Sequence, residues 1–142
     1  QTSIGNKSEM TRLIELYQPR AVMHFAAFIE VGESVQNPLK YYKNNVGQTL
    51  ELLELLSQMG LNKMVFSSTA ATFGEPKNEL IDENHPQNPI NPYGFGKLVI
   101  EHALKDLNRP KEALEYFKKA LKIKPDYADA KLNQAEILKL LK

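Results

Sequence analysis

The sequence predicts an α/β fold in which a β-α-β segment with a short parallel sheet is followed by an α-helical hairpin. Two short apolar runs, residues 21–26 and 63–67, have the length and composition of buried strands. Between them, residues 37–59 carry apolar side chains at helical spacing. A helix that connects two neighbouring strands in this way makes them parallel, through a right-handed crossover.

The first helix is expected over residues 9–17, where apolar residues recur at helical spacing. Ser8 precedes them as a candidate N-cap, and Pro19 stops the helix. The strand of residues 21–26 comes next, and Gly32 lies in the loop that follows it.

The central helix has signals at both of its ends. Pro38 suits the first turn of a helix over residues 37–59, and Gly60 suits its end. After the second strand, residues 74–92 contain four of the eight prolines, which predicts an irregular surface loop over the strand ends. Such loops often shape substrate pockets. A helix over about residues 92–107 completes the α/β segment.

Composition and charge argue against several classes of function. A formal net charge of +1 over 142 residues gives no reason to expect nucleic acid as a partner. Without cysteine the chain forms neither disulfides nor thiolate metal sites, and we expect a cytoplasmic location. No apolar run approaches the roughly 20 residues that span a bilayer, and the three histidines lack metal-ligand spacing. Because the chain opens with Gln1 in place of Met, we expect a fragment or a processed product.

Three residues form a candidate proton-transfer site. Tyr93 and Lys97 are four residues apart on a predicted helix and therefore share one face. An ammonium beside a phenol stabilises the phenolate, so the pair is a candidate general base. Thr69, at the end of the second strand, can orient a substrate hydroxyl between them. This chemistry is typical of dehydrogenases and requires a hydride acceptor.

Six phrases around these residues carry a family resemblance. They are His24-Phe25-Ala26-Ala27, Val31-Gly32-Glu33-Ser34-Val35, Tyr41-Tyr42-Lys43-Asn44-Asn45-Val46, Phe66-Ser67-Ser68-Thr69-Ala70-Ala71, Phe73-Gly74 and Asn91-Pro92-Tyr93-Gly94. In this order they resemble the UDP-glucose 4-epimerases, a group of the extended short-chain dehydrogenase/reductases. The resemblance covers residues 8–107 and implies part of a Rossmann-like fold.

The resemblance implies a role for each candidate residue. Tyr93 is the general acid/base, Lys97 favours its ionised form and binds the nicotinamide ribose, and Thr69 hydrogen-bonds the reacting sugar hydroxyl. The implied cofactor is NAD and the implied substrate is a UDP-sugar. In the family reaction the tyrosine takes the proton of the 4-hydroxyl while C4 gives a hydride to NAD, and the keto sugar then receives the hydride on its other face. The cofactor site is further lined by Asn45 and the backbone around Phe25 and Ala26.

The sequence departs from the family pattern in several places. Ile29 stands where some members have a lysine, and Phe95 and Gly96 lie between the tyrosine and the lysine. The glycines never fall three and six residues apart after a predicted strand, so the GxxGxxG turn that holds the pyrophosphate is missing. We therefore expect the chain to be inactive on its own.

Residues 108–142 resemble a different family. Ala113, Phe117, Ala120 and Pro125 follow at spacings of four, three and five, as in the second helix of a tetratricopeptide repeat. This implies a helical tail that binds a peptide, and the alternative to an enzyme is a chimeric, non-catalytic scaffold with such a tail. A run of lysines in the tail is either a solvated face or a docking surface for an acidic peptide: Lys118, Lys119, Lys122 and Lys124.

The remaining expectations concern the first strand and the histidines. The strand of residues 21–26 has an open edge, and open edges favour pairing, so we expect self-association through it. His24 is expected to be a hydrogen-bonded core residue. His85 and His102 are expected on the surface.

Overall fold

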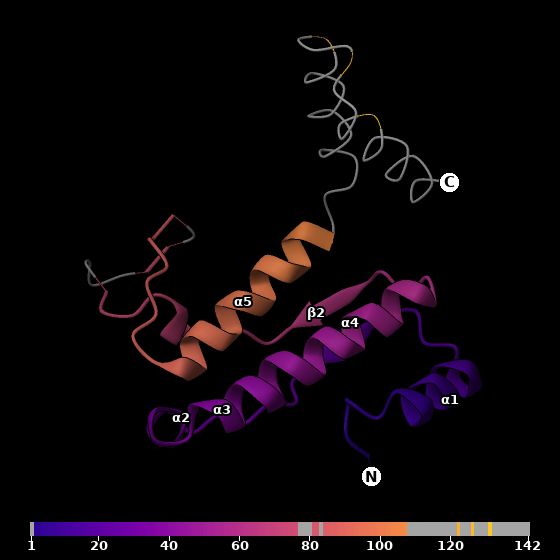
Figure 1. Ribbon diagram of the computed structural model, residues 1–142, viewed down its shortest axis with the longest axis horizontal. Coiled ribbons are helices and arrows are strands. Elements are labelled where there is room, and N and C mark those ends of the chain that lie inside the picture. Colours follow the sequence, from indigo (N-terminus) through magenta and orange to yellow (C-terminus); the bar gives the residue numbers. More distant parts are fainter. Residues whose placement is uncertain are drawn as a thin grey trace. The chain divides into compact units, whose positions relative to one another are not determined.

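The computed structural model describes residues 2–76, 81–82 and 84–107, together with Lys122, Asp126 and Lys131 (Figure 1). The expected tetratricopeptide-like hairpin of residues 108–142 therefore lies outside the described residues, apart from these three positions. The chain divides into two compact units, Gln1–Glu101 and His102–Lys142. The described elements, in chain order, are α1 (Lys7–Tyr17), β1 (Val22–His24), α2 (Val31–Gln36), α3 (Pro38–Tyr41), the π-helix η1 (Tyr42–Gly47), α4 (Gln48–Gln58), β2 (Met64–Phe66), the 3-10 helix η2 (Ala70–Thr72) and α5 (Pro92–Leu107).

The strands β1 and β2 form a two-stranded parallel sheet, which confirms the predicted β-α-β segment. Each strand is three residues long and so shorter than the predicted runs. Backbone hydrogen bonds from Val22 N to Lys63 O (2.9 Å) and from Ser67 N to His24 O (3.1 Å) continue the pairing at both ends. The residues in register are Val22 with Met64, Met23 with Val65 and His24 with Phe66.

The sheet is covered on one face, whereas the sequence predicted buried strands. His24 is 4% exposed, but Met23 and Val65, which point to the opposite face, are 67% and 54% exposed. Successive residues of a strand face opposite sides, so the described helices shield only the face that carries His24.

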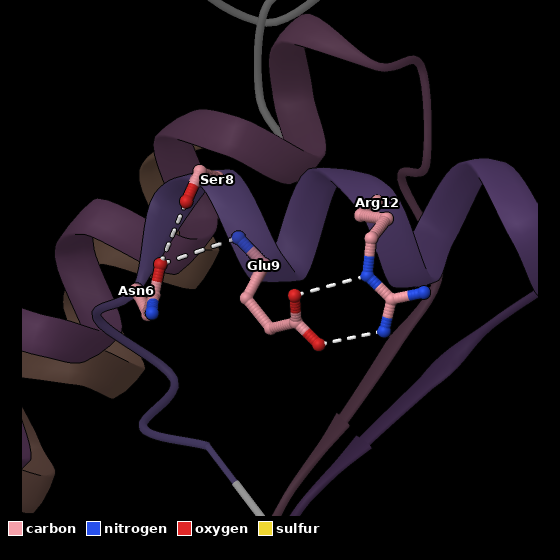
Figure 2. A network of polar contacts seen from close by, with 4 residues as sticks. All are labelled: Asn6, Ser8, Glu9 and Arg12. Atoms are coloured by element: carbon pink, nitrogen blue, oxygen red, sulfur yellow. Dashed lines mark hydrogen bonds and ion pairs between the residues drawn. The ribbon is translucent and has the colours of Figure 1, made fainter.

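The start of α1 differs from the prediction (Figure 2). The N-cap is Asn6 rather than Ser8: the Asn6 Oδ1 atom accepts hydrogen bonds from the Glu9 amide (3.2 Å) and from the Ser8 hydroxyl (3.0 Å). Asparagine is at least as good a cap as serine. One turn on, Arg12 donates two hydrogen bonds to the carboxylate of Glu9, at 2.7 and 3.0 Å, and this contact lowers the pKa of Glu9.

The predicted helix of residues 37–59 is in fact three consecutive elements, α3, η1 and α4. The π-helix η1 widens the turn at its centre, a feature that often marks functional sites. The end of α4 is as predicted: Gly60 has a φ of +71°, and Leu61 N donates to Leu56 O at 2.9 Å. Helix α2 was not predicted, because Gly32 suggested a loop; Gly32 lies inside this short helix.

The hydrophobic core gathers around α4. The buried residues of α4 recur three and four positions apart and therefore share one face of the helix. Helix α1 packs against α4. Among the described residues no helix is both long and apolar enough to span a membrane. The buried hydrophobic residues are Tyr41, Leu52, Leu53, Leu55, Leu56, Tyr93 and Ile100.

Two of the three histidines are buried. His24 lies in the core as predicted, and its Nε2 atom is 2.9 Å from the Thr49 hydroxyl. The prediction for His85 is wrong: it is 7% exposed, with its ring edge-on to Phe73 at 5.8 Å between centroids. His102 is exposed, as predicted.

Candidate active site

Lys97 is a buried cation at the end of β2. It lies on α5, one turn after Tyr93, and is 4% exposed. Its Nζ atom donates a hydrogen bond to the carbonyl oxygen of Ser67 at 2.7 Å. The same atom lies 4.7 Å from the ring centroid of Phe66 and 5.9 Å from that of Tyr93, and ring faces attract cations. Loss of hydration lowers the pKa of Lys97.

Tyr93 is held in the first turn of α5. Its backbone amide donates a hydrogen bond to the Ser34 hydroxyl at 3.2 Å. Pro92 has no N–H, and Gly94 N donates to Asn91 Oδ1 at 2.8 Å. The amides at this helix start, which lack partners within the helix, are thus satisfied by side chains. The position of Tyr93 is therefore defined by its backbone as well as by packing.

Thr69 follows β2 and caps the 3-10 helix η2. Its Oγ1 atom accepts a hydrogen bond from the Ala71 amide at 3.2 Å, and Thr72 Oγ1 donates to the Thr69 carbonyl at 2.9 Å. A hydroxyl has one donor and two acceptor sites. Because Thr69 accepts from the backbone here, its proton can be donated to a substrate oxygen.

Gly94 lets α5 approach the turn that carries Thr69. A Cβ atom at Gly94 would lie 2.4 Å from the carbonyl oxygen of Ala71, so the helix backbone touches this turn directly. The structure therefore brings the Thr69 turn against the helix that carries Tyr93 and Lys97, at the carboxyl end of β2.

Asn45 is buried in the π-helix η1 and holds the segment after β1. Its Oδ1 atom accepts from Phe28 N at 2.9 Å, and its Nδ2 atom donates to Phe28 O at 2.8 Å. The side chain amide is thus used to fix the backbone of this segment. Phe25 is 61% exposed, and Ala26 is also exposed. Of the predicted cofactor residues, Phe25 and Ala26 lie at the carboxyl end of β1 and Asn45 holds Phe28 in the same segment, whereas Lys97 lies at the end of the neighbouring strand β2.

Two buried polar contacts near the site were not predicted. Thr49 holds the ring of His24, and burial together with the charge of Lys97 lowers the pKa of His24. Serine 34 is fully buried. Thr49 lies within the predicted helix of residues 37–59, and its only sequence signal is a small polar residue at a position where the buried face favours an apolar one. Ser34 lies in the segment that was predicted to be a loop, so the spacing of apolar residues gave no signal for its burial.

A third unpredicted contact involves Glu101, farther along α5. Its carboxylate accepts hydrogen bonds from the Ser68 hydroxyl and from Gln87 Nε2, the latter at 2.7 Å. Glu101 thus joins the residue before Thr69 to the proline-rich segment after it.

The described residues fit part of NAD. Ligands of open α/β sheets bind outside the carboxyl ends of the strands. The exposed residues Phe25 and Ala26 lie there, and Lys97 has further N–H donors there beyond its bond to Ser67. The turn that would bind the pyrophosphate of NAD is missing, because the 142 residues contain no glycine-rich turn of the required spacing. Among the described residues no cluster of three or more metal-ligating side chains occurs.

Residues 1–115 match the family model of GDP-mannose 4,6 dehydratase. The chain belongs to this family. The match confirms the resemblance to the extended short-chain dehydrogenase/reductases and continues past the expected boundary at residue 107.

The relatives of this GDP-mannose 4,6 dehydratase family member include many epimerases. The UDP-glucose 4-epimerase of Rhizobium leguminosarum bv. trifolii is 46% identical over 106 residues, which are 75% of this chain and 32% of the relative. UDP-glucose 4-epimerase 2 of Oryza sativa subsp. japonica is 54% identical over 109 residues, 77% of this chain and 27% of the relative. The chain therefore spans between about a quarter and a third of the length of these relatives.

Solved structures agree in fold with this family member. The UDP-glucose 4-epimerase of Brucella ovis in complex with NAD matches with a TM-score of 0.73 and 46% identity, over 75% of this chain and 33% of that one. The epimerase of Bifidobacterium longum in complex with NAD+ and UDP matches with a TM-score of 0.73 and 37% identity, over 75% and 32%. Both of these relatives are complexes with NAD, which is the cofactor that the family resemblance implies.

Proposed function

We propose that this chain carries the proton-transfer part of a UDP-sugar 4-epimerase active site. In this proposal Tyr93 exchanges the proton of the sugar 4-hydroxyl, and Thr69 donates a hydrogen bond to the same oxygen. Lys97 places a positive charge beside the phenol and binds the ribose next to the nicotinamide. NAD, when bound, takes and returns a hydride at the sugar carbon.

The observation that carries the proposal is the buried ammonium of Lys97 next to Tyr93. Burying an ammonium costs free energy, because it loses hydration. The hydrogen bond to the Ser67 carbonyl and the two neighbouring aromatic rings offset this cost only in part, because the pKa of Lys97 is still below its ordinary value. A positive charge in this place stabilises negative charge that develops on a proton acceptor during reaction.

Substrate and cofactor are inferred from the relatives. The structure from Bifidobacterium longum holds NAD+ and UDP, and the Thermotoga maritima epimerase is described with UDP-glucose. Since residues 1–142 contain no glycine-rich turn of the required spacing, we propose that the pyrophosphate of NAD is held by a segment outside these residues.

A thermal-shift titration tests ligand binding by the full chain. UDP-glucose and NAD are added separately and together, and a ligand at about 100 times its Kd stabilises the fold by about 2.7 kcal/mol. We expect a rise in melting temperature that Lys97→Met reduces and that Lys105→Met, at an exposed position near the end of the same helix, leaves unchanged. No rise with either ligand at millimolar concentration would contradict the binding role.

Turnover is tested by the interconversion of UDP-galactose and UDP-glucose. We expect no product from the chain alone, and product when a glycine-rich segment of a relative is added. Tyr93→Phe, which removes only the hydroxyl, should abolish that product. Turnover by the chain alone would show that the glycine-rich turn is dispensable.

A second candidate function is self-association through the first strand. Within the described residues β1 pairs only with β2, which leaves its other edge unpaired there, and Met23 on β1 and Phe25 just after it are 67% and 61% exposed. Sedimentation should show a dimer that Met23→Lys dissociates and that Leu16→Lys, at an exposed site on α1, does not. A monomer at all concentrations would exclude this candidate. Peptide binding by the tail and a cytoplasmic location stay predictions.

A further inference from the structure

Ser34 lies outside the predicted site, and its side chain makes a hydrogen bond with the backbone of Tyr93. It lies on α2 and is 0% exposed. Its hydroxyl accepts a hydrogen bond from Tyr93 N at 3.2 Å, across 59 residues of sequence. The same hydroxyl donates to the carbonyl oxygen of Val31 at 2.6 Å.

Chemistry fixes the direction of both bonds. A carbonyl oxygen cannot donate, so the hydroxyl proton of Ser34 points to Val31 and a lone pair is left for the Tyr93 N–H. Serines within helices commonly make the first, local kind of bond. The second bond is different, because it fills the place of a helix cap from another part of the chain.

The contact joins two parts of the candidate site. Helix α2 directly continues the segment after β1, which contains Phe25 and Ala26 and lies on the expected cofactor side. Helix α5 carries Tyr93 and, one turn later, Lys97. Because Tyr93 N is the first N–H of α5 after Pro92, its bond sets where the helix begins.

We propose that Ser34 is a positioning residue for Tyr93. Its hydroxyl sets the start of α5 against α2 and thereby the place of the phenol relative to Lys97 and to the segment after β1. Its consequence for catalysis rests on the function proposed above. The positioning itself requires no ligand and can be measured on the chain alone.

Two substitutions in the full 142-residue chain test the proposal. Ser34→Ala removes the hydroxyl with little change in side-chain volume, and Ser34→Cys keeps a slightly larger side chain of the same shape with a much weaker acceptor. Ser57→Ala, at an exposed position on α4, is the matched control. In NMR hydrogen-exchange measurements we expect the Tyr93 amide to exchange about tenfold faster or more in both Ser34 variants. The Gly94 amide, held by Asn91, and the Leu55 amide in α4 should change by less than about threefold.

A second NMR measurement reports the position of the Tyr93 ring through the resonances of Lys97. The ε-protons of Lys97 lie close to the rings of Tyr93 and Phe66 and are shifted by their ring currents, so a displaced Tyr93 changes their resonance positions. We expect this change in both Ser34 variants and not in Ser57→Ala. Unchanged Tyr93 exchange, or equal acceleration at Tyr93 and Leu55, would overturn the proposal. These readings need neither sugar nor NAD, so they decide the proposal even if the chain binds neither.

Discussion

The contact between Gly94 and Ala71 predicts that Gly94→Ala destabilises the fold, although alanine is the better helix former. Inside a helix, alanine is favoured over glycine by about 1 kcal/mol. Against this gain, a Cβ atom at Gly94 would lie 2.4 Å from the carbonyl oxygen of Ala71 and 2.9 Å from its carbonyl carbon. Ordinary contact begins at 3.4 Å, so the oxygen is about 1 Å too close.

The neighbouring atoms decide the size of the effect. They belong to the backbone of η2, which cannot rotate aside as a side chain can, so α5 and the Thr69 turn must separate. Overpacking of this kind costs about 1–3 kcal/mol, and a backbone contact belongs at the upper end. After the helix-propensity gain is subtracted, we expect a net loss of about 2 kcal/mol in the free energy of unfolding.

Urea unfolding followed by circular dichroism measures this loss, with two other glycines as controls. Gly32 on α2 has no atom within 4 Å of a built Cβ, so Gly32→Ala should stabilise the chain by about 0.5–1 kcal/mol. Gly96 faces only the Val46 Cγ2 atom at 3.2 Å, and this side chain can move, so Gly96→Ala should fall between the two. If Gly94→Ala were as stable as Gly32→Ala, the close approach of α5 to η2 would be refuted.

Two further predictions concern buried polar side chains. Asn45→Ala removes both part-buried hydrogen bonds to the Phe28 backbone, so it should lower the free energy of unfolding by about 2 kcal/mol. Asn44→Ala loses one hydrogen bond to a side chain and should cost well under half of this. Equal losses in urea unfolding would contradict the role of Asn45 in holding the Phe28 backbone. For His24, burial and the charge of Lys97 place the pKa in the folded state below its ordinary value of 6.5, so the unfolded chain binds the proton more readily and the free energy of unfolding should fall as the pH drops below about 6.5. His24→Asn should flatten this dependence in thermal melts between about pH 7.5 and 5.5. A slope in this variant equal to that of the wild type would show that other groups cause it.

The parts of the fold with strong local patterns were predictable from the sequence. The two strands, their parallel pairing and the helix α5 follow from apolar runs and from helical spacing. Tyr93 and Lys97 share a helix face because they are four residues apart, and the structure keeps them together. The division of residues 37–59 into three elements was not predictable, because a π-helix changes the hydrogen-bonding pattern without changing the run of helix-forming residues.

The residues that position the site depend on partners far along the chain. Ser34 bonds to a residue 59 positions away, Thr49 to one 25 away and Asn45 to one 17 away. Each is small and polar, so a pattern of apolar spacing assigns it to the surface, and the bond that makes its burial favourable exists only after the chain has folded. A partial signal was nevertheless present for Thr49: it lies three and four positions before Leu52 and Leu53, on the buried stripe of α4. At such a position the helix pattern favours an apolar residue, so a hydrogen-bonding residue there indicates a buried polar partner. Here that partner is the ring of His24. The backbone carbonyl of His24 in turn accepts from the Ser67 amide, and Ser67 is the residue whose carbonyl binds Lys97.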